Sequence, residues 1–293
     1  MSLETAQMPT DGTWRAVTPE GAQAIEQVAA MAAQVLLVSD FDGTLAPIVD
    51  DPTQSRPHPA ALEAFAGLGR HVAQLAVVTG REVQVCRQLG GFERVPGFEK
   101  LVVLGQYGQE SWDAATGEVA LPPVPEQVTA AHQELEALVA SAGPELDGVV
   151  LEDKGRAIGV HTRRAADPEG AFVALQAPVA RVAQAHGLLL EPGRHVIEVR
   201  SSAITKGDAI QSLVDRFSPG VVVMMGDDLG DLAAFARVVE LREQGIVGIR
   251  VVAGSAEQPD VAAQADVLCD GPSGIAAWLQ DLLARVERVR KQG

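Results

Sequence analysis

The stretch Val35-Leu36-Leu37-Val38-Ser39-Asp40-Phe41-Asp42-Gly43-Thr44 decides the fold, because a uniformly apolar run ends in two carboxylates. A run that does not alternate, such as Val35–Val38, is typical of a strand buried on both faces of a parallel sheet. In open α/β sheets, ligands bind beyond the carboxyl ends of the strands. We therefore expect Asp40 and Asp42 at the functional edge of a sheet, with Gly43 allowing a tight turn around an anion.

Similar apolar runs recur along the chain and alternate with helical patterns. The runs are 75–78, 101–104, 221–225 and 246–252, and the helical patterns are 19–34, 57–70, 81–90, 205–217 and 228–242. This alternation favours a doubly wound α/β core with a mainly parallel sheet. The expected organisation is a leader and helix over 1–34, a core in two parts at 35–111 and 201–293, and an inserted α+β cap over 112–200. The basic tail 284–293 is expected to be a fraying helix end.

The middle third combines helical periods at 125–142 and 168–187 with segments of period two. The segments 149–154 and 157–163 flank a turn at 154–156, and 194–200 follows later. Alternation places a polar set on one face of the predicted sheet: Glu152, Lys154, His161, Arg163, Arg194, Glu198 and Arg200. We expect a small antiparallel sheet with helices on its apolar face and an open polar face, acting as a cap over the active site. The alternative is a solvated face of charge pairs.

Composition excludes several classes of protein. The 293 residues are 47% hydrophobic and carry a net charge of −16, which disfavours nucleic acid and anionic membrane surfaces as partners. No apolar run is long enough to span a membrane, and no targeting segment is recognisable at the N-terminus. The two cysteines, Cys86 and Cys269, have no metal-type spacing and suit a reducing compartment. We expect a cytoplasmic protein, with a monomer as the working expectation.

Three further polar clusters follow apolar runs, and each has an alternative interpretation. They are Thr79-Gly80-Arg81, Lys206 at the start of a helical pattern, and Gly226-Asp227-Asp228-Leu229-Gly230-Asp231. A hydroxyl beside helix amides can hold phosphate, a lysine can neutralise it, and crowded carboxylates need a cation. The alternatives are an ordinary helix N-cap, a solvated lysine and an acidic helix N-terminus. Taken together, the clusters supply a nucleophile, a phosphate clamp, a counter-charge and metal ligands.

The order of these motifs resembles the haloacid-dehalogenase (HAD) superfamily of phosphotransferases over residues 35–270. The resemblance implies Asp40 as nucleophile and Asp42 as general acid and then base. It implies that Thr79 and Lys206 hold the phosphate, and Gly43, Gly80 and Arg81 are further predicted substrate-binding residues. It implies Mg²⁺ bound by Asp40, the carbonyl of Asp42 and Asp227, with Asp228 or Asp231 in support.

Residues 40–49, Pro52 and Pro57-His58-Pro59 are similar to those of trehalose-6-phosphate phosphatases, as are Glu152–Gly155 and Glu198–Arg200. This resemblance implies removal of phosphate from trehalose 6-phosphate through an aspartyl phosphate. It implies sugar contacts from the polar face of the cap: Glu152, Lys154, His161, Arg163, Glu198 and Arg200. The chain departs from the family pattern at Gly230 and Leu232, where Thr and Glu are usual, and at Gly105-Gln106-Tyr107-Gly108, where Gly-x-His-Gly is usual. The alternatives are a sucrose- or glucosylglycerol-phosphate type of substrate, or a catalytically silent sugar-phosphate-binding subunit of a synthase complex.

Overall fold

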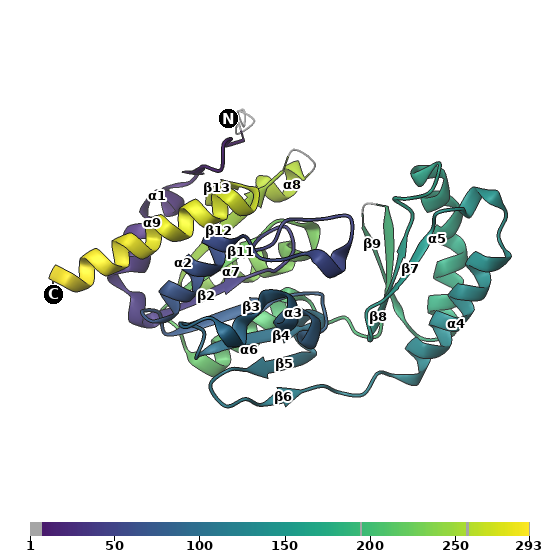
Figure 1. Cartoon of the computed structure of the whole chain (residues 1–293), viewed down its shortest axis with the longest axis horizontal. Coiled ribbons are helices and arrows are strands. Elements are labelled where there is room, and N and C mark those ends of the chain that lie inside the picture. The colour runs from purple at the N-terminus through teal and green to yellow at the C-terminus, as the bar shows by residue number, and fades with distance from the viewer. Residues whose placement is uncertain (1–7, 194, 256–257, 293) are drawn as a thin grey trace. The chain divides into compact units, whose positions relative to one another are not determined.

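The computed structural model describes residues 8–193, 195–255 and 258–292, which form two compact units (Figure 1). The second unit is Leu121–Ala203, and the described residues before and after it make up the first. The predicted insert began at residue 112, earlier than the second unit does, because residues 110–120 form strands that extend the sheet of the first unit. Residues 1–7 of the predicted leader and Arg194 lie outside the described residues.

A mainly parallel sheet forms the centre of the first unit. Among the described residues its order is β1 (Trp14–Ala16), β13 (Val267–Asp270), β12 (Val247–Gly254), β11 (Val221–Gly226), β2 (Val35–Ser39), β3 (Gln74–Val78), β4 (Leu101–Gly105), β5 (Glu110–Asp113) and β6 (Val119–Ala120). The strands from β13 to β4 run parallel, and β1, β5 and β6 are antiparallel additions at the edges. The predicted parallel strands are confirmed, whereas β1, β5, β6 and β13 were not predicted.

Helices cover both faces of this sheet (Figure 1). One face packs against α1 (Pro19–Ala30), α2 (Pro59–Gly69), α3 (Val83–Gly90) and α9 (Gly271–Gln292), and the other against α6 (Lys206–Phe217), α7 (Leu232–Glu243) and α8 (Pro259–Ala262). Along β2, Leu37 enters one core and Leu36 and Val38 enter the other. All three side chains are fully buried, so the uniform apolar run follows from burial on both faces. In the part of the chain that the structure describes, every helix is too short or too polar to cross a lipid bilayer.

Capping interactions at two helix starts fix the backbone of the loops that precede them. Single 3₁₀ turns occur at Ala32–Gln34, Pro52–Gln54, Phe92–Arg94, Pro144–Leu146 and Leu229–Asp231. The turn at Gln106–Gly108 has positive φ angles throughout. The helix predicted from residue 228 begins at Leu232 instead, because Asp228 and Asp231 form a capping box around the 3₁₀ turn between them. At α6, Thr205 and Asp208 form a second capping box, which fixes Lys206 as the first helical residue.

The second unit is a four-stranded antiparallel sheet with helices on its apolar face. The order is β7 (Val150–Asp153), β8 (Ala157–His161), β10 (Val196–Arg200) and β9 (Leu189–Gly193), and the helices are α4 (Glu126–Ser141) and α5 (Pro168–Ala185). Ile158, Val160 and Val199 are fully buried against those helices, as the period-two pattern predicts. Arg163 does not belong to a strand as predicted, because β8 ends at His161 and Arg163 lies exposed in the turn that follows.

A buried carboxylate, Asp266, ties the loop before β13 to the rest of the sheet. It is fully buried and accepts hydrogen bonds from the backbone and guanidinium of Arg250, and it also pairs with Arg242. Burial alone would raise the pKa of Asp266, but the hydrogen bonds and charge of Arg250 hold it below its usual range. The carboxylate therefore stabilises the fold at neutral pH, and that contribution is lost as pH falls below about 4.

Asp266→Ala is expected to lower the free energy of unfolding by about 3–5 kcal/mol, because it removes a fully buried carboxylate and leaves two partly buried guanidinium groups without their partner. The measurement is the urea midpoint at pH 7, with Asp260→Ala, an exposed aspartate in α8, as the matched control. The loss should shrink at pH 3. A loss equal to that of the control would show that the Asp266 cluster does not stabilise the fold.

Candidate active site

The candidate site lies where two neighbouring parallel strands, β2 and β11, are each followed directly by an aspartate. The amide of Asp40 donates to the carbonyl of Met225 at 2.8 Å, so the residue after β2 is locked beside the end of β11. Asp40 is 4% exposed, which rules out the interpretation of its motif as a solvated polar turn. The parallel register therefore brings residues 40 and 227, far apart in sequence, to one edge of the sheet.

Lys206 is the counter-charge of this edge. Its side chain is 3% exposed, and Nζ lies 2.9 Å from Oδ1 of Asp40 and 2.7 Å from Oδ1 of Asp231. The alternative of a solvated surface lysine is therefore wrong. An ammonium at the start of a helix is disfavoured by the helix dipole, and here two buried carboxylates offset that cost.

Asp231 holds the loop after β11 together. One oxygen accepts from Lys206, and the other accepts from the amides of Asp227, at 2.9 Å, and Asp228, at 3.1 Å. Because both oxygens already have donors, Asp231 fixes Lys206 and the direction of the Asp227–Asp228 backbone at once. The sequence predicted a metal-supporting role for Asp231, and its contacts show this positioning role as well.

Asp227 is held against the loop that follows β2. Its Oδ1 accepts from the hydroxyl of Thr44 at 2.9 Å. Gly43 has φ +74°, and a Cβ added to it would lie 1.9 Å from Oδ2 of Asp227. Only glycine fits this position, both because the backbone is left-handed and because the carboxylate occupies the space. Thr44 was not predicted as a site residue, although it follows Gly43 directly in the motif.

The carboxylates form a set that suits a divalent metal ion. Among the described residues, one oxygen each of Asp40, Asp228 and Asp231 lie within 4.8 Å of one another. Carboxylate oxygens are the hard ligands that Mg²⁺ prefers, and its remaining positions are usually filled by water and phosphate oxygens. Asp227, predicted as a direct metal ligand, is not a member of this group. Asp228, predicted only as a supporting residue, is a member.

Electrostatics also indicate a cation at this edge. Burial raises the pKa of Asp40 well above its usual range, with Lys206 opposing and Asp231 adding to the rise. Burial likewise raises the pKa of Asp227, to which Asp40 contributes, and raises the pKa of Asp231 to about 6. Burial lowers the pKa of Lys206, but Asp231 and Asp40 outweigh it and hold that pKa well above its usual range. One lysine thus leaves several crowded carboxylates only partly compensated, which a bound dication would offset.

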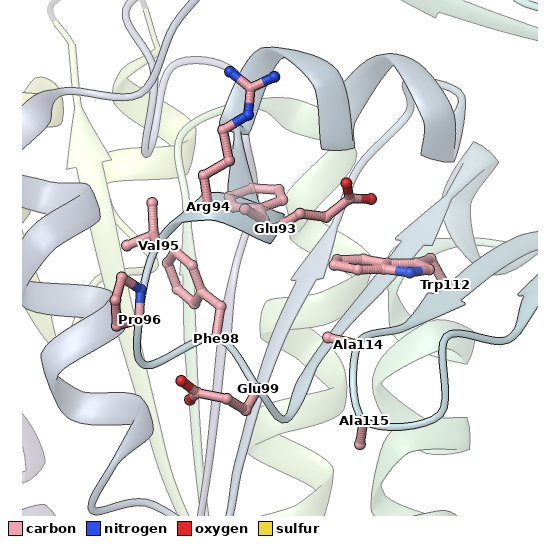
Figure 2. A pocket seen from close by; sticks show the side chains of 10 residues that line it. Glu93, Arg94, Val95, Pro96, Phe98, Glu99, Trp112, Ala114 and Ala115 are labelled. Atoms are coloured by element: carbon pink, nitrogen blue, oxygen red, sulfur yellow. The ribbon is translucent and has the colours of Figure 1, made fainter.

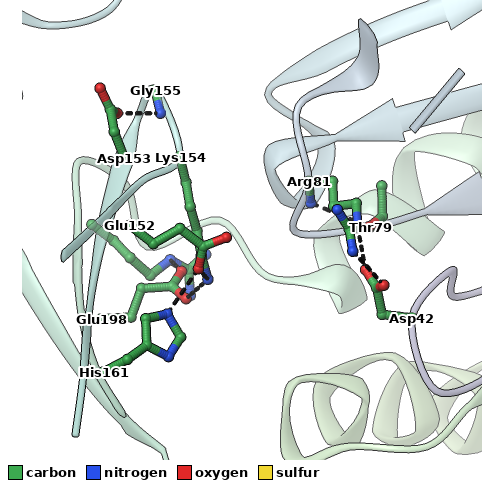
Figure 3. A network of polar contacts seen from close by, with 10 residues as sticks. Asp42, Thr79, Arg81, Glu152, Asp153, Lys154, Gly155, His161 and Glu198 are labelled. Carbon is green, nitrogen blue, oxygen red and sulfur yellow. Dashed lines mark hydrogen bonds and ion pairs between the residues drawn. The ribbon is translucent and has the colours of Figure 1, made fainter. Parts of the chain in front are cut away.

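Asp42 is oriented by Arg81 (Figure 3). Arg81 donates from Nε to Oδ2 of Asp42 at 2.5 Å and from Nη2 to Oδ1 at 2.7 Å, and Ser55 donates to Oδ1 at 3.0 Å. This two-point contact fixes the plane of the carboxylate as well as its position. Arg81 was predicted to contact substrate, and in the structure it holds Asp42. Ser55 was not predicted, because nothing in the segment around Pro52 and Pro57 marks it as a partner of Asp42.

Thr79 follows β3 at the same edge and is 1% exposed. Its hydroxyl accepts from the amide of Arg81 at 3.2 Å, and α3 begins only at Val83. The alternative that Thr79 is an ordinary helix N-cap is therefore wrong. Gly80, next to it, packs against the phenol of Tyr107, whose oxygen lies 2.9 Å from where a Cβ would be.

The polar face of the second unit carries an ion-pair network (Figure 3). Lys154 Nζ lies 2.9 Å from Glu198 Oε2, and His161 Nε2 lies 2.8 Å from Glu152 Oε2. Arg200 pairs with Glu191 in the next strand and is 6% exposed. The register sets Glu152 and Glu198 on either side of Gly159 in β8. The imidazole of His161 lies over this glycine, with Nε2 2.7 Å from where a Cβ would be. The predicted residues Glu152, Lys154, His161, Glu198 and Arg200 thus share one face.

A separate pocket opens near the edge of the first unit (Figure 2). It has a volume of about 530 Å³ and is lined by Phe92, Glu93, Arg94, Val95, Pro96, Phe98, Glu99, Trp112, Ala114 and Ala115. None of the aspartates at the ends of β2 and β11 lines it, so this pocket is not the candidate active site.

Solved structures with a similar fold define the class of this chain. The C-terminal domain of the C. albicans trehalose-6-phosphate phosphatase is similar with a TM-score of 0.69 and 18% identity, covering 94% of this chain and 99% of that one. A haloacid dehalogenase-like hydrolase from Bacteroides thetaiotaomicron is similar with a TM-score of 0.55 and 14% identity, covering 84% of this chain and 98% of that one. The chain therefore has the HAD-like α/β fold, and the predicted fold class is confirmed.

Sequence comparison places the chain more narrowly. Residues 38–270 match the profile of the trehalose-phosphatase family, and the chain belongs to this family. It is 32% identical over 266 residues to a trehalose-phosphate phosphatase of Mycobacterium tuberculosis, a match that covers 87% of this chain and 62% of that protein. It is 29% identical over 275 residues to the Mycobacterium leprae protein of the same name, covering 89% and 60%. The chain thus spans less than two thirds of the length of these relatives.

Proposed function

We propose that this chain is a magnesium-dependent phosphatase that removes phosphate from trehalose 6-phosphate, with Asp40 as the nucleophile. The observation that carries the proposal is the buried Asp40 carboxylate, 2.9 Å from Lys206 and grouped with Asp228 and Asp231 oxygens within 4.8 Å. A carboxylate so placed can attack phosphorus while a cation on each side neutralises the phosphate. Membership of the trehalose-phosphatase family supports the sugar assigned here.

In the proposed first step, Oδ of Asp40 attacks phosphorus and the bond to the sugar oxygen breaks. Asp42 gives its proton to that oxygen, so the sugar leaves as a neutral alcohol. Lys206, together with Thr79 and the loop at Gly80, binds the remaining phosphate oxygens. Asp40, the Asp42 carbonyl and Asp227, with Asp228 or Asp231 in support, would hold Mg²⁺, which would supply positive charge beside the transferring phosphoryl group. Asp42 then takes a proton from the water that hydrolyses the aspartyl phosphate.

Sugar recognition is assigned to the polar face of the second unit. Glu152, His161, Lys154 and Glu198 form fixed donors and acceptors that match the alternating demands of sugar hydroxyls. Arg200 lies on the same face, and Arg163 lies just beyond it.

The test is phosphate release from trehalose 6-phosphate with Mg²⁺ and with EDTA, beside sucrose 6-phosphate, glucosylglycerol phosphate and glucose 6-phosphate. We expect kcat/KM for trehalose 6-phosphate to exceed that of each other sugar phosphate by at least about 10-fold and to vanish with EDTA. Preference for another sugar phosphate would leave the proposed phosphatase mechanism in place and contradict trehalose 6-phosphate as the substrate. No release from any phosphate ester would favour a silent sugar-phosphate-binding subunit.

A further inference from the structure

The turn between β4 and β5 has an unusual backbone that nothing in the proposed mechanism uses. Gln106, Tyr107 and Gly108 have φ of 50°, 59° and 105°, so three consecutive residues are left-handed and two of them are not glycine. Such conformations are unfavourable for residues with a Cβ, and they persist where surrounding contacts enforce them. The contacts of this turn therefore indicate its purpose.

The left-handed turn aims its amides at the loop that carries Arg81. The amide of Gln106 donates to the carbonyl of Arg81 at 2.9 Å, and the amide of Tyr107 donates to the carbonyl of Thr79 at 3.0 Å. The phenol of Tyr107 packs on Gly80, between these two points. A turn of ordinary right-handed residues would point these amides elsewhere, and the carbonyls of the loop would lose their donors.

Glu110, the first residue of β5, makes a further contact with the loop that carries Arg81. It is 8% exposed, and its Oε2 accepts from the amide of Val83 at 2.7 Å, at the start of α3. Gly105, its partner in the register, leaves no room for a side chain: an added Cβ would lie 2.5 Å from the amide of Val83. Residues 105–110 thus hold the 79–83 loop at three backbone points.

We propose that Glu110, with the left-handed turn beside it, is a positioning residue for the general acid. Glu110 holds the loop at the amide of Val83, and the amide of Gln106 in the turn holds the carbonyl of Arg81. Arg81 in turn holds both oxygens of Asp42. This inference rests on the proposed function, since it takes Asp42 as the proton donor to the leaving group. Without the Glu110 acceptor, the 79–83 loop is free to move. Arg81 then no longer fixes the orientation of the Asp42 carboxylate.

The test compares leaving groups. A sugar alkoxide needs a proton to depart, whereas p-nitrophenolate is a weak base and departs without one. Glu110→Ala is expected to lower kcat/KM for trehalose 6-phosphate by on the order of 10- to 100-fold and for p-nitrophenyl phosphate by less than about 3-fold. Glu110→Gln keeps an acceptor oxygen and should restore both values to within about 3-fold of wild type. Glu118→Ala, an exposed glutamate near the same hairpin, is the matched control.

Two readouts distinguish positioning from damage to the fold. In an Asp42→Asn background, Glu110→Ala should cause no further loss, because its effect passes through Asp42. Amide exchange of residues 79–83 should rise in Glu110→Ala and stay at the wild-type level in Glu110→Gln. If Glu110→Ala does not fold, Glu110→Asp, whose carboxylate is one methylene short of the Val83 amide, takes its place.

Equal losses on both substrates, an additive loss beside Asp42→Asn, or unchanged exchange would each overturn the proposal. Amide exchange does not depend on turnover, so it tests whether Glu110 holds the 79–83 loop even if the chain has no activity. If wild type hydrolyses p-nitrophenyl phosphate and glucose 6-phosphate but not trehalose 6-phosphate, the proposed function fails on its substrate. The leaving-group comparison then uses glucose 6-phosphate, and its outcome still decides the role of Glu110.

Discussion

Asp40→Asn is expected to lower kcat for phosphate release by about 10⁴-fold or more, because the amide that replaces the carboxylate is a poor nucleophile. The change is nearly isosteric and leaves the backbone bond to Met225 in place. We therefore expect the folded structure, measured by circular dichroism, to be retained. The measurement is single-turnover phosphate release at saturating Mg²⁺.

Asp260→Asn serves as the control for loss of an aspartate, since Asp260 is exposed in α8. It should keep wild-type turnover. Asp40→Asn with more than about a tenth of the wild-type kcat would be incompatible with nucleophilic catalysis by Asp40.

Lys206→Met should produce the second largest effect, a drop in kcat of about 10²- to 10³-fold. The ammonium is the buried cation between Asp40 and Asp231, so its removal strips charge compensation from the phosphate and from both carboxylates. Removing one partner of a buried pair also destabilises a fold by about 3–5 kcal/mol. Steady-state kinetics and the urea midpoint should be measured on the same preparation.

Lys206→Arg keeps the charge but not the geometry, and it separates the two effects. We expect it to recover much of the stability and little of the activity, because a planar guanidinium cannot contact Asp40 and Asp231 as a compact ammonium does. Lys291→Met, at the exposed end of α9, is the control. An active Lys206→Met enzyme would remove Lys206 from the phosphate site.

The parallel core and the positions of Asp40 and Asp227 were predictable because uniform apolar runs encode strands buried on both faces. Polar residues directly after such runs must meet at one edge of the sheet. The edge strands were harder to predict. β9 begins with two leucines, but Glu191 and Pro192 interrupt the apolar run, and β1 has only three residues, so neither carries a pattern long enough to mark a strand.

Contacts between side chains that are far apart in the sequence also could not be predicted. Arg81 was expected to face the substrate, and only the folded loop shows that it reaches Asp42 across 39 residues. Ser55 and Glu110 are polar residues without a motif of their own, and their roles depend on tertiary contacts. The helix α9, by contrast, has Ile275, Leu279 and Leu282 at helical spacing, and this pattern could have been recognised before the structure.

The central claim is that phosphate passes through the carboxylate of Asp40. The most direct test is to quench the enzyme during turnover of trehalose 6-phosphate, reduce it with borohydride and map the modified residue by peptide mass spectrometry. An aspartyl phosphate is reduced to homoserine, so we expect homoserine at position 40, in samples with Mg²⁺ and not in those with EDTA. Homoserine at another aspartate, or none at position 40 while phosphate is being released, would contradict the account.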